Sequence, residues 1–218
     1  MTRVNVVVEG QTEKSFIDNV LAEALWRHEV FLTARVLGIP GKKGGCPNYE
    51  RLKGDLILLL KGDPTAVCSM MLDLYGLGPD FPGSATGGSG LQKALHIEAA
   101  VKADICKTIP EFRPDARFIP YLQLHEFEAL LFSAPCEFAN AINERQLEPH
   151  FKAIRESFQT PEDIDDGPES APSKRILSYC PRYAKVGDGT RAAKKIGVEQ
   201  MRLECPHFRS WLEQLESL

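Results

Sequence analysis

The chain has 218 residues, of which 43% are hydrophobic and 26% are charged. This composition is typical of a globular protein and excludes the disordered and collagen-like classes. The formal net charge of −4 gives no overall attraction to nucleic acid, so any such binding would depend on a local patch. No run approaches the roughly 20 apolar residues of a membrane-spanning helix, and the start lacks a signal-peptide pattern. We therefore expect a cytoplasmic protein without a membrane segment.

The first predicted strand is Val4 to Val8, which holds four valines in five residues and suits a strand covered on both faces. It runs into Glu9 and a glycine, and we expect Thr12 to cap a helix over about residues 13–28. An acid at the carboxyl end of a parallel strand lies where open α/β sheets bind their ligands. This position predicts a functional role for Glu9, with Glu13 on the first helical turn directed toward it.

The next elements alternate in type along the chain. We predict a strand over 30–37, a helix over 49–61, a strand over 66–73, a helix over 91–108 and a strand over 116–123. Loops rich in glycine and proline separate them at 38–48 and 76–90, and the length of the second is typical of a functional or mobile loop. Pro120 favours an edge or bulged position for the last strand.

This order predicts an α/β fold. Residues 1–135 should form a parallel sheet of about four strands flanked by helices, and residues 136–218 a helical C-terminal extension packed on it. Residues 156–169 carry six acids and no base, which indicates a solvated loop. Six cysteines lie far apart without a CxxC pair, which argues against a zinc ribbon or a disulfide framework and favours buried thiols. His125 is expected to be a packed histidine rather than a ligand.

Acids follow three of the four predicted strands. They are Glu9, Asp73 and the pair Glu126 and Glu128. Clustered carboxylates repel one another and are costly to bury unless a cation lies among them. Oxygen ligands without histidine or cysteine suit Mg²⁺ or Mn²⁺, and two such ions would serve in-line phosphoryl displacement. The alternative is that each acid only caps a helix or faces solvent.

The segment 173–202 is basic, with eight Lys or Arg residues against Asp188 and Glu199. The candidate nucleic-acid contacts in it are Lys174, Arg175, Arg182 and Lys185. Such cations supply sequence-independent affinity for phosphates, and Tyr179 and Tyr183 could stack on bases. The alternative is a surface helix that pairs with the acidic loop before it.

Four motifs carry a resemblance to a known family. The motif Val8-Glu9-Gly10-Gln11-Thr12-Glu13 is similar to the opening motif of toprim domains, in particular that of the overcoming-lysogenization-defect nucleases. Together with segments 72–76, 124–130 and 173–176, it makes the chain resemble an uncharacterised bacterial toprim-like family, domain of unknown function 4276. The resemblance implies a metal-dependent phosphodiester site with Glu9 and Asp73 linked to the metal. It also implies that Glu13, Glu126 and Glu128 complete the site.

We therefore expect a Mg²⁺- or Mn²⁺-dependent nuclease acting on DNA or RNA, as a component of a defence or DNA-processing system. The expected catalytic residues are Glu9, Asp73, Glu126 and Glu128, and the expected metal ligands are Glu9, Glu13, Asp73 and Glu126. The resemblance also implies a separate ABC-type ATPase partner, because the chain has no GxxxxGK[ST] loop of its own. The alternatives are a non-catalytic module that binds nucleic acid or the ATPase, and a metal-dependent phosphatase.

The third predicted strand departs from the toprim pattern. Toprim domains usually carry Asp-x-Asp there, whereas this chain has Asp73-Leu74-Tyr75. Alternation along an extended chain would put Tyr75 beside Asp73, and a neutral phenol is a poor ligand for a hard cation. We expect Glu126 and Glu128, or less favourably Asp80, to supply the missing oxygens. One ion should then bind more tightly than the second.

Overall fold

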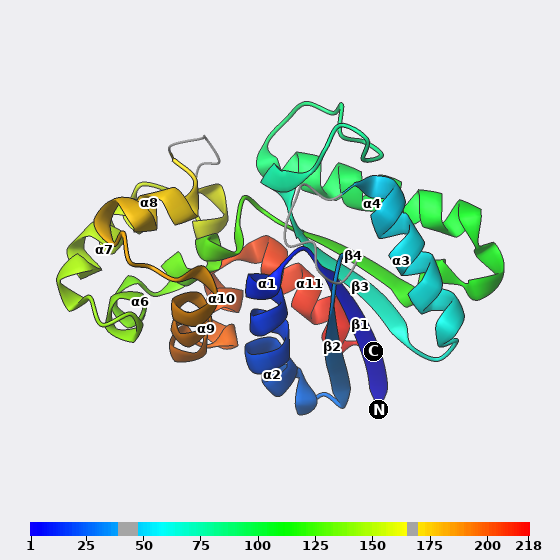
Figure 1. The fold of residues 1–218 in the computed structure, drawn as a ribbon, viewed down its shortest axis with the longest axis horizontal. Helices are drawn as coiled ribbons and strands as arrows, with labels where there is room; N and C mark the ends of the chain where they lie inside the picture. Colours follow the sequence, from blue (N-terminus) through cyan, green and yellow to red (C-terminus); the bar gives the residue numbers. More distant parts are fainter. Residues whose placement is uncertain (39–47, 165–169) are drawn as a thin grey trace.

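A parallel four-stranded sheet with the strand order β2-β1-β3-β4 forms the centre of the molecule (Figure 1). The computed structural model describes residues 1–38, 48–164 and 170–218, so the predictions for 39–47 and 165–169 lie outside the described residues. The strands are β1 (Thr2–Val8), β2 (Val30–Val36), β3 (Val67–Asp73) and β4 (Phe118–Gln123). The predicted α/β fold is confirmed, and β4 is an edge strand, as Pro120 predicts.

Helices flank the sheet and form the C-terminal region. They are α1 (Gln11–Phe16), α2 (Ala22–Trp26), α3 (Tyr49–Gly62), α4 (Gly90–Thr108), α5 (Pro114–Arg117), α6 (Pro135–Ala141), α7 (Glu148–Glu156), α8 (Pro172–Tyr179), α9 (Lys185–Ile196), α10 (Val198–Glu204) and α11 (Pro206–Glu216). A π-helical turn (Ile17–Leu21) joins α1 to α2. Short 3-10 turns occupy Leu74–Gly76, Pro110–Phe112, Phe127–Ser133, Arg145–Leu147 and Pro161–Asp163. None of the described helices is long and apolar enough to cross a bilayer.

The first helix begins earlier than the sequence predicts. Its N-cap is Gly10, whose backbone N–H donates to the Glu13 carboxylate at 3.0 Å. The predicted cap at Thr12 is wrong, because Thr12 already lies in the first turn of α1. The first helical turn therefore directs Glu13 back toward the end of β1.

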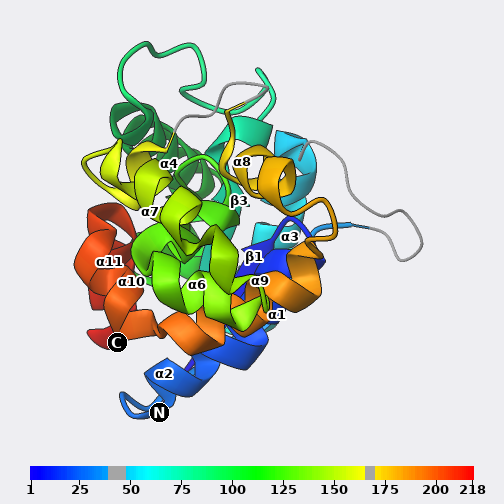
Figure 2. The ribbon, with the colours of Figure 1, turned by 90° about the vertical axis from the view of Figure 1, so that its left-hand side faces the viewer.

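Each face of the sheet has its own apolar core. On one face, Val7 and Met70 are buried with Leu56 of α3 and Val101 of α4. On the other face, the core runs continuously from β1 and α1 into the C-terminal helices, where Trp211 of α11 stacks on a sheet tyrosine. Figure 2 looks onto this helical layer, in which α6, α9, α10 and α11 lie together. The C-terminal region thus covers one face of the sheet.

The structure bears on two predicted loops and contradicts the prediction for one of them. In the loop after β3, Phe81 is buried and packs on Tyr49 with ring centroids 5.4 Å apart, while Asp80 accepts the N–H of Tyr49 at 2.7 Å. This part of the loop is therefore anchored on the start of α3. The predicted solvated acidic loop is wrong at Glu162, which is 3% exposed and caps α11 by accepting the N–H groups of His207 and Phe208.

The described cysteines form no disulfide bonds with one another. Cys68, Cys180 and Cys205 are buried, Cys106 is half-buried and Cys136 is exposed.

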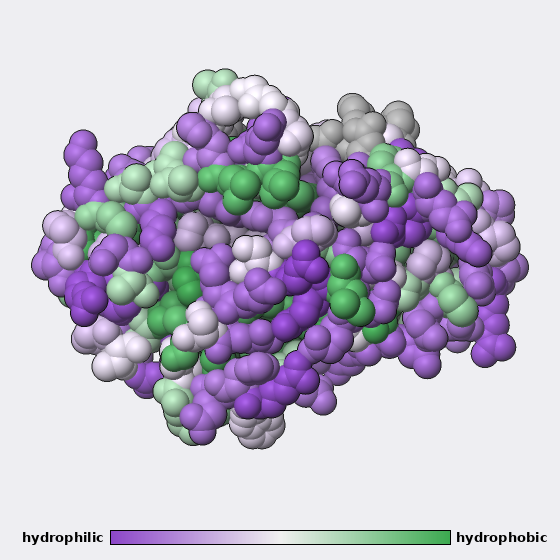
Figure 3. Space-filling view, turned by 180° about the vertical axis from the view of Figure 1, so that it is seen from behind, coloured by the Kyte–Doolittle hydropathy of each residue, from purple (hydrophilic) through white to green (hydrophobic). Residues whose placement is uncertain are grey.

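Seen from behind, the surface is mainly hydrophilic, with hydrophobic patches set apart from one another (Figure 3).

Candidate functional site

Five carboxylates gather at the carboxyl edge of the sheet and form what we call the acid cluster. They are Glu9 after β1, Glu13 on α1, Asp73 at the end of β3, and Glu126 and Glu128 after β4. The ends of β1 and β3 are close together, since a Cβ atom placed on Gly76 would lie 3.3 Å from a carboxylate oxygen of Glu9. The edge of the parallel sheet therefore brings together acids that are distant in sequence.

Asp73 and Glu128 each place a buried carboxylate oxygen in the cluster. Burial raises the pKa of Asp73 well above its ordinary value, and the charges of Glu13, Glu128, Glu9 and Glu126 raise it further. Burial likewise raises the pKa of Glu128, which is 2% exposed, to about 7. Within the described part of the chain, Asp73 Oδ1 and Glu128 Oε1 are buried and accept no hydrogen bond. Such oxygens are costly in a protein interior unless another group compensates them.

Burial and neighbouring charges also act on the pKa values of Glu9 and Glu13. Burial raises the pKa of Glu9 to about 7, and the neighbouring charge of Glu13 adds to this effect. The pKa of Glu13 is also raised by burial, although the N–H of Gly10 stabilises its charged form. The pKa values of four acids of the cluster are thus raised, because burial and the neighbouring carboxylates disfavour their charged forms.

The C-terminal region supplies two further residues to this edge. The Lys185 ammonium, at the start of α9, lies 3.5 Å from Glu126 Oε1 and 3.7 Å from Glu128 Oε1. Burial lowers the pKa of Lys185, but the charges of Glu128, Glu126 and Asp73 outweigh it, so the pKa is raised. Ser173, at the start of α8, donates its backbone N–H and its hydroxyl to the two oxygens of Glu126, at 2.8 and 3.0 Å. Lys185 and Ser173 therefore belong to the site.

Sequence reasoning missed Ser173 as a site residue and placed Lys185 on a phosphate-binding surface. Lys185 is separated from Glu126 by 59 positions, and no local pattern connects them. The available signal for Ser173 was its place at the start of one of the four family-like motifs.

The other predicted nucleic-acid contacts differ in how far their side chains are already engaged. Lys174 is exposed. The Arg175 side chain donates to the carbonyl of Ser170 at 2.6 Å, and the Arg182 side chain pairs with Glu144 at 2.6 Å. These two guanidinium groups already serve intramolecular contacts.

The two tyrosines predicted to stack on bases have different environments. Tyr179 is exposed and stacks on His150 with ring centroids 4.4 Å apart. Tyr183 is buried against Phe138, so the prediction that it stacks on bases is wrong. Its ring belongs to the apolar core of the C-terminal helices.

The alternation expected beyond Asp73 does not occur. β3 ends at Asp73, and the chain then turns through the 3-10 segment Leu74–Gly76, so Tyr75 is not in an extended chain. Tyr75 is 53% exposed, and Asp80 is engaged at the start of α3. Of the two expected replacements, both Glu128 and Glu126 raise the pKa of Asp73, and the effect of Glu128 is the larger.

His125 lies beside the acid cluster without being one of its acids. It is half-buried, and its φ of 66° is in the left-handed region, at the turn between β4 and the 3-10 segment that carries Glu128. A Cβ atom on Gly90 would lie 3.7 Å from its ring. These contacts agree with a packed histidine.

The donor set of the cluster fits a hard divalent cation. Every candidate ligand is a carboxylate oxygen, and two of these oxygens are buried without a hydrogen bond. Among the residues that the structure describes, no three His, Cys, Asp or Glu side chains are already arranged as a coordination shell.

The fold and the cluster define an α/β protein with a carboxylate-rich site at the carboxyl edge of a parallel sheet. Residues 8–216 match the family described as a domain of unknown function (DUF4276), and the chain belongs to that family. Comparison with curated proteins and with solved structures finds no match.

Proposed function

We propose that this protein is a Mg²⁺- or Mn²⁺-dependent phosphodiesterase that cleaves nucleic acid and is related to toprim nucleases of the overcoming-lysogenization-defect type. The observation that carries the proposal is the acid cluster, in which Asp73 Oδ1 and Glu128 Oε1 are buried without a hydrogen bond. A buried set of like charges is costly to maintain, and binding a divalent cation would compensate that cost. The opening motif, Val8 to Glu13, resembles that of toprim nucleases and supports the choice of reaction.

Glu9, Asp73 and Glu128 would hold the cation, with Glu13 and Glu126 at its margin. When bound, the cation would polarise a phosphoryl oxygen and lower the pKa of a bound water. Ser173 fixes both oxygens of Glu126, so that this acid holds one orientation. The Lys185 ammonium faces the same edge and supplies a positive charge for a substrate phosphate. Because the toprim pattern lacks its second aspartate here, we propose one tightly held ion and a second that is recruited with substrate phosphate.

The test is cleavage by Asp73→Asn with Mn²⁺ or Mg²⁺ on plasmid, single-stranded DNA and RNA. We expect activity to fall by more than about a hundredfold, since loss of an outer-sphere partner alone costs about 10- to 100-fold. Affinity for nucleic acid should change far less. Asp115→Asn is the matched control, because Asp115 is an exposed aspartate on α5, outside the cluster. Equal activity of Asp73→Asn and wild type would refute the proposal.

The competing proposal is a non-catalytic module that uses the same fold to hold nucleic acid or a separate ABC-type ATPase. The absence of a ready coordination shell among the described residues favours it. A protein that cleaves nothing in either form, alone or with a purified ATPase partner, would establish the module instead.

A further inference from the structure

A second surface of the sheet carries functional side chains outside the acid cluster. We call it the β1–β2 shelf, formed by Arg3 and Asn5 of β1 and by Phe31, Thr33 and Arg35 of β2. These residues share one face of the sheet, because side chains alternate along each strand. On this face α3 packs over β1 and β3, whereas Thr33 and Arg35 of the edge strand β2 remain exposed. A hollow of about 560 Å³ is lined by the shelf together with Leu58 and Leu59 of α3.

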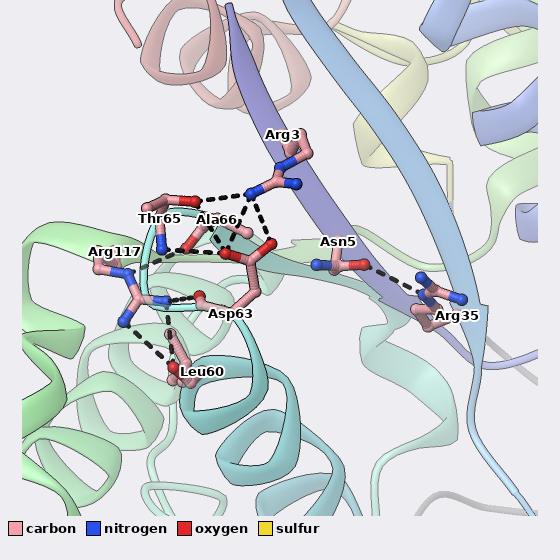
Figure 4. Close-up of polar contacts among 8 residues, drawn as sticks. All are labelled: Arg3, Asn5, Arg35, Leu60, Asp63, Thr65, Ala66 and Arg117. Carbon is pink, nitrogen blue, oxygen red and sulfur yellow. Dashed lines mark hydrogen bonds and ion pairs between the residues drawn. The ribbon is translucent and has the colours of Figure 1, made fainter.

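The polar groups of the shelf are held in place. Arg35 donates from Nε to the side-chain oxygen of Asn5 at 3.1 Å. Arg3, at the other end, pairs with Asp63 at 2.8 Å and donates to Thr65 at 2.6 Å. Figure 4 shows Arg3, Asn5 and Arg35 following one another along the two strands. Among the described residues, no carboxylate pairs with Arg35, so its end of the shelf keeps a positive charge.

An aromatic ring, that of Phe31, lies on the edge strand beside Arg3 and four residues before Arg35. Phe31 is half-buried and is supported by Trp26 of α2, with ring centroids 6.3 Å apart in an edge-to-face arrangement. An aromatic face next to guanidinium groups, amides and hydroxyls is the combination on which proteins stack and hold unpaired bases. In a duplex the faces of the bases are stacked on one another, so they are not available to stack on Phe31.

The shelf runs along β1 toward its carboxyl end, on the face of the sheet opposite to the side chain of Asp73. Arg35 is in register with Val7, two residues before Glu9, which is about 7 Å along a strand. Phe31 is in register with Arg3, four residues further back, or about 13 Å. The shelf therefore extends from near the end of β1 to its beginning.

The open edge of β2 is partly closed to an added peptide strand. The carboxylate of Asp18 accepts the backbone N–H of Ala34 at 3.0 Å, and therefore takes one of the groups that a pairing strand would need. A ligand of this surface must use the side chains of the shelf rather than the strand edge. The chemistry of those side chains is cationic and aromatic.

We propose that the β1–β2 shelf binds a single-stranded segment of nucleic acid. The assignment rests on the proposed function, and it narrows the substrate to a strand with unpaired bases. Phe31 stacks on a base, Arg35 binds a phosphate, and Asn5 and Thr33 provide polar contacts.

The experiment is fluorescence anisotropy with a labelled oligothymidylate in EDTA, so that no cleavage occurs. Phe31→Ala should weaken binding by about 5- to 100-fold, the range that loss of one stacked base produces. Arg35→Gln should weaken binding and reduce the slope of log K against log salt by about 0.7. Thr33→Glu places a negative charge on an exposed position and should also weaken binding. Arg145→Gln, at an exposed arginine on the 3-10 turn Arg145–Leu147, is the matched control and should bind as wild type does.

Circular dichroism checks that each variant is folded. If Phe31→Ala does not fold, Thr33→Glu still tests the shelf, because Thr33 is exposed. Wild-type affinity in Phe31→Ala, Arg35→Gln and Thr33→Glu would overturn the proposal. The proposal would also be overturned if blunt duplex displaced the labelled probe as well as unlabelled oligothymidylate does. Equal displacement by polyglutamate would overturn it too, and would indicate that the shelf binds protein. A protein that binds oligothymidylate through the shelf but never cleaves would retain this inference and refute the proposed function.

Discussion

The buried carboxylate of Glu128 shows how one side chain can lower stability. Its pKa is raised to about 7, mainly by burial, although Lys185 lies 3.7 Å from its Oε1. A pKa raised above the ordinary value of 4.5 means that the folded protein disfavours the ionised form. The ion pair with Lys185 therefore compensates only part of the cost of burying this charge.

We expect Glu128→Gln to stabilise the cation-free protein at pH 8, by on the order of 1–2 kcal/mol, because it removes an ionised buried group. The same substitution should abolish the rise in melting temperature that Mn²⁺ produces in the wild type by mass action. Urea unfolding in EDTA and thermal melts with Mn²⁺ measure the two effects. Glu156→Gln, at an exposed acid of α7, is the control.

A destabilised Glu128→Gln that still responds to Mn²⁺ would contradict this prediction. It would mean that the ion pair with Lys185 outweighs the repulsion, and that Glu128 is a structural partner.

At the residue scale, the sequence located the acids because each follows an apolar strand. It did not show that Ser173 holds Glu126, since the two are 47 positions apart. It also assumed an extended chain beyond Asp73, where a 3-10 turn directs Tyr75 to solvent. Local sequence patterns predict where strands end, but they do not predict which side chains distant in sequence contact the residues at those ends.

Among the elements, the start of α11 gathers three titratable side chains. Glu162 accepts two backbone N–H groups of its first turn, and the His207 ring lies 3.0 Å from Glu98 of α4. His207 also stacks on Tyr121 of β4. Burial lowers the pKa of His207, but the hydrogen bond and charge of Glu98 outweigh it and Glu162 adds to them, so the pKa is raised above 6.5.

This raised pKa predicts a pH dependence of stability. The contribution of protonated His207 is complete below the unfolded-state pKa of about 6.5 and is lost as the pH rises through the higher folded-state pKa. His207→Gln should therefore remove part of the fall in unfolding free energy above pH 6.5. Urea unfolding from pH 6 to pH 9 measures the difference between the two proteins, and His150→Gln, at an exposed histidine, is the control.

Identical pH profiles for the wild type and His207→Gln would show that the ring is neutral throughout. In that case Glu98 would accept a hydrogen bond from a neutral imidazole as well as from the backbone N–H of Leu122.

The elements of the sheet followed from hydrophobic patterns, and the predicted strands agree with the observed ones within about two residues at each end. Less regular segments did not. The π-helical turn inside the first helix and the 3-10 turn Phe127–Ser133 have ordinary helical sequences, and tertiary packing decides their geometry. The polar composition of the acidic loop predicted a solvated segment. Glu162 is instead buried, because its carboxylate accepts two backbone N–H groups at the start of α11.

For the whole molecule, the helical region completes both the core and the site. The continuous core on one face of the sheet joins Val6 and Phe16 to Phe208 and Trp211. Trp211 stacks on Tyr121 of β4 at 4.4 Å and donates to the Ser69 hydroxyl of β3 at 2.9 Å. The sequence indicated a helical extension, but its amphipathic helices did not show which face of the sheet they would cover.

This shared core predicts that residues 1–135 do not fold alone. Without the helices beyond residue 135, the part of this sheet face around Tyr121 would lose the cover of Trp211 and its neighbours. Burial of large apolar side chains contributes about 1.5–3 kcal/mol each. Because a domain is stable by only about 5–15 kcal/mol, losing several of these contacts exceeds that margin. Circular dichroism should show no cooperative melt for residues 1–135, and co-expression with 136–218 should restore it. A cooperative melt of residues 1–135 alone would mean that the α3 and α4 face suffices to stabilise the sheet, and that the helical region folds onto a preformed domain.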